Sequence, residues 1–128
     1  MIDLHVKTIP NKKQRYPTIG DWFKKKGKDH IKISDMGNWK YETLVSIHEQ
    51  IEYALCRSRG IYQSKVDRFD IRFERERASG KVNRYDEPGD DPRSPYFREH
   101  LFASKIECLL AQALNVDWLK YEDKVNSL

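Results

Sequence analysis

The sequence predicts an α+β fold in which a small three-stranded antiparallel sheet is followed by a layer of three helices. Apolar and polar residues alternate over the first 35 positions, which is the period of half-buried strands. From about residue 38 onward, apolar residues recur every three or four positions, which is the period of amphipathic helices. A chain of 128 residues has the size of one domain, so we expect a single domain over 1–128.

The strands are expected in three short segments. In 2–9, Leu4 and Val6 lie on one side of the strand and His5 and Lys7 on the other. Residues 16–23 read as a turn that leads into a second strand, and a Gly-containing turn at 26–29 separates it from a third strand at 30–34. We expect these strands to pair in an antiparallel sheet.

The three helices are expected at 39–59, 64–77 and 95–114. Asn38 is a favourable N-cap for the first helix, and Gly60 is a favourable residue to end it. In the third helix, Ser94 is expected at the N-cap and Pro95 at the first position. After this helix, Val116, Trp118 and Tyr121 suggest a short tail that docks on the domain.

A long connection rich in Gly, Pro and Asp spans 78–94. We expect a mobile surface segment beside the start of the third helix, where it would act as a lid. The alternative is a plain connector.

The net charge of +4 is distributed unevenly. Basic residues concentrate near the N-terminus, at Lys12, Lys13, Arg15, Lys24, Lys25, Lys26 and Lys28. Such a region suits nucleic acid or another acidic partner. The alternative is a solvated hairpin tip whose lysines keep an edge strand soluble. No zinc-finger spacing, helix-turn-helix pattern or aromatic-rich RNA motif accompanies the charge.

The two cysteines, Cys56 and Cys108, lie on predicted helices and do not form a CxxC motif. We expect buried, reduced thiols in a reducing compartment. The N-terminus lacks the pattern of a signal peptide, and no apolar run approaches the roughly 20 residues that span a bilayer. These features predict a cytoplasmic protein.

Ionisable residues occupy positions on predicted helices where apolar residues are expected. His48 lies at the centre of the apolar face of the first helix, Glu52 lies about 40° from it, and Glu49 borders that face. On the third helix, Glu99 and His100 point toward the apolar side. Burying a carboxylate costs several kcal/mol unless a cation or hydrogen-bond donors compensate it.

This coincidence predicts a metal centre. Imidazole and carboxylate ligands without thiolate suit Zn²⁺ or another divalent ion of similar size. His48 and Glu52 can chelate from one face of a helix, and either Glu99 or His100 would supply a third ligand. One coordination position would stay open, and Glu49 could hold and deprotonate a metal-bound water there.

The alternative to a metal is a structural network of hydrogen bonds and salt bridges. In that interpretation the polar residues only specify the fold. Glu107 and Asp70, which also flank apolar faces, would then be buried partners of arginines.

The segment His48–Glu52, HEQIE, resembles the HExxH helix of zincin metallopeptidases, with Glu at the second His position. In that resemblance Ile31–Ser34 corresponds to the edge strand that binds substrate. Arg98–Ala103 followed by Leu109-Leu110 resembles a helix of minimal gluzincin-type domains related to ImmA/IrrE. The resemblance covers roughly residues 30–112. It implies that Glu99 is the third ligand, with His100 as an alternative, and that the protein is a peptidase or a relative that has lost cleavage.

The whole chain also resembles small proteins of tailed phages and prophages that carry no known activity, which would place it in the cytoplasm of a bacterial host. A second possible function is therefore a non-enzymatic accessory or anti-defence protein that binds an unknown protein or peptide partner. A third is a Mg²⁺-dependent nucleotide pyrophosphohydrolase, because Glu49-x-x-Glu52 and Asp67-x-x-Asp70 loosely match the ExxE…ExxD pattern of those all-α enzymes. The expected strands and a capping role for Asp67 weaken that match.

Overall fold

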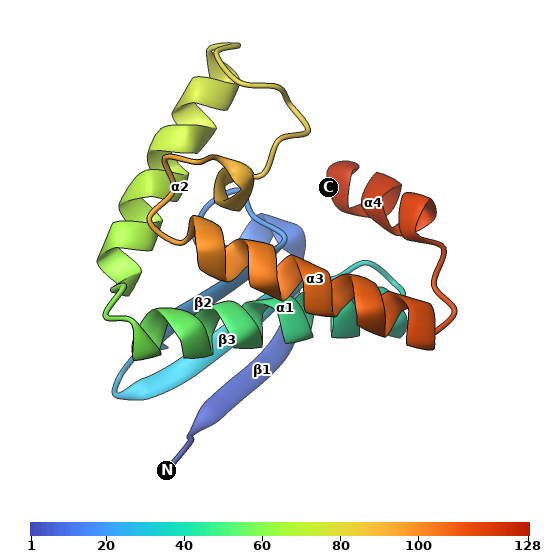
Figure 1. The fold of residues 1–128 in the computed structure, drawn as a ribbon, viewed down its shortest axis with the longest axis horizontal. Coiled ribbons are helices and arrows are strands. Elements are labelled where there is room, and N and C mark those ends of the chain that lie inside the picture. Colours follow the sequence, from blue (N-terminus) through green and yellow to red (C-terminus); the bar gives the residue numbers. More distant parts are fainter.

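The computed structural model describes residues 1–128 and confirms the α+β class. The elements in chain order are β1 (Leu4–Ile9), the 3-10 turn η1 (Asn11–Lys13), β2 (Gly20–Lys25), β3 (Lys28–Ser34), α1 (Trp39–Ser58), α2 (Gln63–Ala78), the 3-10 turn η2 (Pro88–Asp90), α3 (Phe97–Ala113) and α4 (Trp118–Asn126) (Figure 1). No helix is both long enough and apolar enough to span a membrane. Cys56 is buried, Cys108 is half-buried, and both are free thiols.

The sheet is mixed, so the prediction of an entirely antiparallel sheet is wrong. Its strand order is β1-β3-β2. β2 and β3 form an antiparallel hairpin across Lys26 and Gly27, which have φ of 52° and 73°, as the tight two-residue turns of hairpins require. β1 runs parallel to β3. Alternation shows which residues share a face but carries no information on strand direction, and the connection over 10–19 places β2 two positions away from β1.

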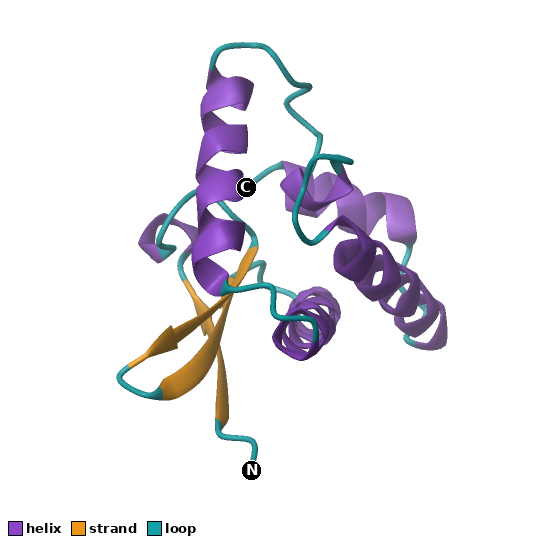
Figure 2. Cartoon of the chain, turned by 60° about the vertical axis from the view of Figure 1, so that its left-hand side comes forward, coloured by secondary structure: helices purple, strands orange, loops and turns teal.

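α1 packs on one face of this sheet, and α3 lies along α1 (Figures 1 and 2). The main core is formed by Ile31, Ile33, Met36, Leu44, Val45, Ala111 and Tyr121. A second cluster, of Cys56, Val66, Phe69, Phe73 and Tyr96, joins α2 to α1 and to the start of α3. No α-helix packs along the opposite face of the sheet, and the 3-10 turn η1 lies at one end of it.

The helix boundaries follow the local capping chemistry. The side chain of Asn38 accepts the N–H groups of Lys40 and Tyr41 at 3.0 and 3.3 Å, which confirms it as the N-cap of α1. Gly60 ends that helix with a φ of 68°. α3, however, begins at Phe97, two residues after the predicted start. Ser94 Oγ accepts the N–H of Tyr96 at 3.2 Å, so Ser94 caps a separate turn that precedes the helix.

The C-terminal tail docks as predicted, and it does so as the helix α4. The side chain of Asp117 caps this helix by accepting the N–H of Lys120 at 3.2 Å. Tyr121 is then buried in the main core. α4 and α2 consequently lie on either side of the start of α3 (Figure 1).

The connection over 78–94 is held against α2 and α3. The guanidinium of Arg77 donates to the carbonyl oxygens of Asn83, Arg84 and Asp86. Arg93 forms an ion pair of 2.7 Å with Glu76. The segment passes over the start of α3, in the position expected of a lid. Its mobility stays a prediction.

Candidate metal centre

Three buried side chains bring one ligand atom each to a common point. Nε2 of His48 lies 2.7 Å from Oε2 of Glu52, and Nδ1 of His100 lies 2.6 Å from the same oxygen. The two ring nitrogens are 3.0 Å apart. His48, Glu52 and His100 therefore form a group that could hold one cation.

The arrangement follows from helix geometry. His48 and Glu52 are four residues apart on α1 and share its inner face. His100 stands in the first turn of α3, which packs along α1. The sequence predicts that His48 and Glu52 meet either Glu99 or His100, and in the structure the residue they meet is His100.

Each imidazole also turns its second nitrogen toward other carboxylates. Nδ1 of His48 lies 2.7 Å from Oε1 of Glu107. Nε2 of His100 lies within ion-pair distance, 3.2 Å, of an oxygen of Glu87 and of one of Asp90, but makes no hydrogen bond. Carboxylates in these positions favour the proton on the outer nitrogens. If a cation displaced the inner protons, Nε2 of His48 and Nδ1 of His100 would face it with their lone pairs, as in many metal sites.

Glu107 is itself held in place from α4. The hydroxyl of Tyr121 donates to Oε2 of Glu107 at 2.5 Å. Burial and the nearby Glu107 charge raise the pKa of Tyr121, so its hydroxyl stays protonated and remains a donor. The expectation that Glu107 pairs with an arginine is wrong. The pattern showed only that Glu107 was buried, whereas its two partners, His48 and Tyr121, lie on other helices.

The charges of His48, Glu52 and His100 strongly affect one another's pKa values. Burial alone would raise the pKa of Glu52, but the charges of His48 and His100 and their hydrogen bonds outweigh burial and lower it to about 2. Burial would likewise lower the pKa of both imidazoles. Their carboxylate neighbours outweigh burial and raise both pKa values above the usual range. In the metal-free protein, imidazolium charge compensates the buried carboxylates.

Glu49 borders the group on α1 and is buried as well. Burial, and next the charge of Glu52, raise the pKa of Glu49 well above its usual value. Its carboxylate lies against Gly20 on the edge strand β2, where an added Cβ would come within 2.8 Å of Oε1. This close approach explains the glycine at position 20.

A cavity of about 580 Å³ opens beside the group. Its walls come from β2, all four helices and the connection over 84–90, and both Glu49 and the three converging residues face it. The three converging residues and Glu49 therefore line one hollow between α2 and α4, which stand apart in Figure 1.

Glu99 is placed elsewhere. Its carboxylate forms an ion pair with Arg59 at the end of α1, and it is not a member of the converging group. The expectation that Ile31–Ser34 form an edge strand is wrong, because they belong to β3, the central strand. Gly20 of β2 is the edge-strand residue that reaches Glu49.

A second buried polar cluster lies next to the cavity. Asp70 accepts hydrogen bonds from the hydroxyls of Tyr96 and Tyr16 at 2.7 and 3.0 Å, so the expected arginine partner is wrong. Burial raises the pKa of Asp70 to about 7 against these hydrogen bonds. Asp67 forms a bidentate pair with Arg15 at 3.0 Å. Asp67 and Asp70 do not join Glu52 in a common group.

Sequence reasoning did not identify Glu87, Asp90 and Tyr121 as contacts of this site. The acidic composition of the connection was visible, but its position over His100 depends on the packing of Gly89. A Cβ at Gly89 would lie 2.3 Å from Cγ of His100. In comparisons with known proteins, no protein family model, no curated protein and no solved structure matches this chain.

Proposed function

We propose that this protein is a metal-dependent hydrolase whose divalent ion is bound by Nε2 of His48, the carboxylate of Glu52 and Nδ1 of His100. One observation carries the proposal. Both imidazoles direct one nitrogen to the same Glu52 oxygen and the other nitrogen to a separate carboxylate. This is how metal-binding histidines are oriented.

The distances between the three atoms are compatible with a cation site after a small rearrangement. A tetrahedral ion with bonds of about 2.0–2.1 Å separates its ligand atoms by about 3.3 Å. The three atoms lie 2.6, 2.7 and 3.0 Å apart, so each would move by less than about 1 Å. Without an ion, the protons on the two imidazoles supply the positive charge that faces the Glu52 oxygen, and a bound cation would take their place.

The ligand set indicates the ion and its chemistry. Two imidazoles and one carboxylate without a thiolate suit Zn²⁺ or a similar divalent ion. When bound, such an ion polarises a carbonyl group and lowers the pKa of water to near 7. Three protein ligands leave a fourth position open, and the cavity lies beside it.

Glu49 is the residue we assign as general base. Glu49 follows His48 directly in the chain and lines the same cavity. Its carboxylate forms no hydrogen bond or ion pair with a basic side chain. Its pKa is raised in the metal-free protein, and a divalent charge nearby would favour its ionised form. The carboxylate would then accept a proton from water at the open position. The HExxH-like segment gives Glu49 the same role.

Peptide hydrolysis is the more specific form of the proposal, because the motif resembles that of zincin peptidases. A relative that has lost cleavage would keep the metal site and the fold. The two forms differ in one measurable property, which is hydrolysis of a fluorogenic peptide library by the metal-loaded protein.

The metal itself is tested with untagged protein purified without chelator. Elemental analysis should find about one divalent ion per chain in the wild type, and none in His48→Ala. Glu99→Gln is the matched control, since it removes a buried carboxylate on α3 outside the group and should keep the ion. Glu49→Gln should retain the ion and abolish any hydrolysis. A metal-free wild type that also fails to take up Zn²⁺ in titration calorimetry would overturn the proposal.

A further inference from the structure

The outer face of the sheet, opposite α1, carries a row of three rings between two rows of lysines. His5, His30 and Phe23 lie side by side across β1, β3 and β2 in the observed register. The ring centroids of neighbouring residues in this row are 5.5 Å apart. The aromatic row therefore runs across the whole width of the sheet.

The lysine rows flank the rings on both sides. Lys25 of β2 lies opposite Lys28 of β3, two residues along the strands from the row of rings. Lys7 of β1 lies opposite Lys32 of β3, two residues from the rings in the other direction. Two residues along a strand span about 7 Å, so the lysine rows stand about 13 Å apart with the rings between them. Of all lysines in the chain, only Lys24 lies within ion-pair distance of a carboxylate, at 3.8 Å. The lysines of this face are therefore available to an anionic ligand.

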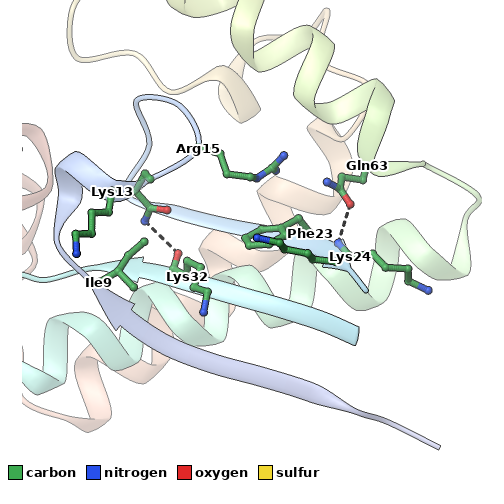
Figure 3. A pocket seen from close by; sticks show the side chains of 9 residues that line it. Ile9, Lys13, Arg15, Phe23, Lys24, Lys32 and Gln63 are labelled. Atoms are coloured by element: carbon green, nitrogen blue, oxygen red, sulfur yellow. Dashed lines mark hydrogen bonds between the residues drawn. The ribbon is translucent and has the colours of Figure 1, made fainter. Parts of the chain in front are cut away.

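A hollow of about 390 Å³ lies over one end of this face (Figure 3). Five of its nine lining residues are basic and none is acidic. They are Ile9, Lys13, Gln14, Arg15, Phe23, Lys24, Lys25, Lys32 and Gln63. Figure 3 shows Arg15 beside the ring of Phe23, with Lys13 and Lys32 further along the sheet.

Arg15 is fixed in that position. Its guanidinium lies 4.6 Å from the Phe23 ring centroid and is held by Asp21 at 2.7 and 2.9 Å and by Asp67 at 3.0 Å. Its charge is neutralised by these carboxylates. Arg15 therefore presents a planar surface for stacking, while the unpaired lysines around it supply the positive charge.

The basic charge of the protein is concentrated in this part of the chain. Residues 1–35 contain nine Lys and Arg against four Asp and Glu, whereas residues 36–128 contain 15 against 16. The positive net charge of the molecule thus belongs to the sheet and its turns. The converging group of His48, Glu52 and His100 lies on the other side of the sheet, between α1 and α3.

We infer that the outer face of the sheet binds single-stranded nucleic acid, with phosphates on the lysines and bases on the rings and on Arg15. A single strand offers both chemistries at once, since its bases are open to stacking. A duplex hides the faces of its bases, and an acidic protein or a phosphate polymer has no bases to stack. The inference is independent of the proposed hydrolase function.

Binding is measured by fluorescence anisotropy with labelled 15-nucleotide dT and rU strands, in the presence of EDTA. The duplex of the same length and inorganic polyphosphate serve as competitors. We expect the single strands to bind more tightly than the duplex. About three neutralised phosphates should give a slope near −2 for the logarithm of the affinity against the logarithm of salt.

Lys25→Ala/Lys32→Ala should weaken single-strand binding by about tenfold or more and flatten the salt slope by about 1.4. Lys105→Ala/Lys120→Ala is the matched control, because it removes the same charge from exposed lysines of α3 and α4, and it should bind like the wild type. His5→Ala should weaken binding without changing the slope. No binding at 50 mM salt, equal loss in both double variants, or competition by polyphosphate or duplex as strong as by the single strand would overturn the inference.

Discussion

Nε2 of His48 lies 3.0 Å from Nδ1 of His100, although 52 positions separate the two residues in the chain. One imidazole comes from the middle of α1 and the other from the first turn of α3. The other nitrogen of each imidazole lies near a different carboxylate, that of Glu107 for His48 and those of Glu87 and Asp90 for His100. The two nitrogens that face each other share only the carboxylate of Glu52. The metal proposal depends on this pair.

The first prediction concerns the residue that orients His48. Glu107→Gln removes the charge that accepts from Nδ1 of His48 but keeps the size of the side chain. We expect Zn²⁺ affinity to fall by about 10- to 100-fold, because outer carboxylates fix the tautomer and the basicity of the metal-binding imidazole. Affinity is measured by competition with a chromophoric chelator. Asp123→Asn, an exposed change on α4, is the control and should leave the affinity unchanged. An unchanged affinity in Glu107→Gln would show that His48 needs no such partner.

The second prediction concerns pH. Burial raises the pKa of Asp70 to about 7, against about 3.9 in the unfolded chain. Between these values the folded state holds a proton that the unfolded state has lost, so stability is greatest below pH 4 for this group and falls as pH rises toward 7. Three pKa units correspond to at most about 4 kcal/mol.

Asp70→Asn should therefore remove this fall in stability with pH, because its amide can bond both Tyr16 and Tyr96 without ionising. Urea unfolding at pH 5 and pH 8 measures the difference. We expect the stability of the variant relative to the wild type to increase by about 1–3 kcal/mol from pH 5 to pH 8. A wild type whose stability rises between pH 5 and pH 8 as much as that of the variant would contradict the assignment.

The third prediction compares two glycines that touch different parts of the site. An added Cβ at Gly89 would lie 2.3 Å from the ring of His100, whereas one at Gly20 would lie 2.8 Å from the carboxylate of Glu49. Gly89→Ala should lower the affinity for Zn²⁺, because it displaces a ligand. Gly20→Ala should keep the metal and reduce hydrolysis, because it displaces the base.

Each of these two substitutions should also cost about 1–3 kcal/mol of stability through overpacking. The measurements are Zn²⁺ titration, peptide hydrolysis and urea unfolding for both variants. If both substitutions impaired metal binding equally, the separation of Glu49 from the ligand set would be wrong.

The periodicity of the sequence predicted much of the fold because capping and burial are local properties. Asn38 and Gly60 bound α1 as their chemistry requires, and α2 starts within one residue of its predicted start. The parallel direction of β1 was not predictable in this way. It depends on the path of the connection over 10–19, for which alternation gives no signal.

The sequence by itself determined that His48 and Glu52 share one face of a helix, because a spacing of four residues does so in any α-helix. It also determined that α3 carries two candidate partners at adjacent positions, Glu99 and His100. Only the tertiary structure decided between them. Neighbouring side chains diverge by about 100° around a helix axis, so the packing of α3 on α1 can direct only one of the two toward Glu52. In the folded protein that residue is His100, while Glu99 meets Arg59.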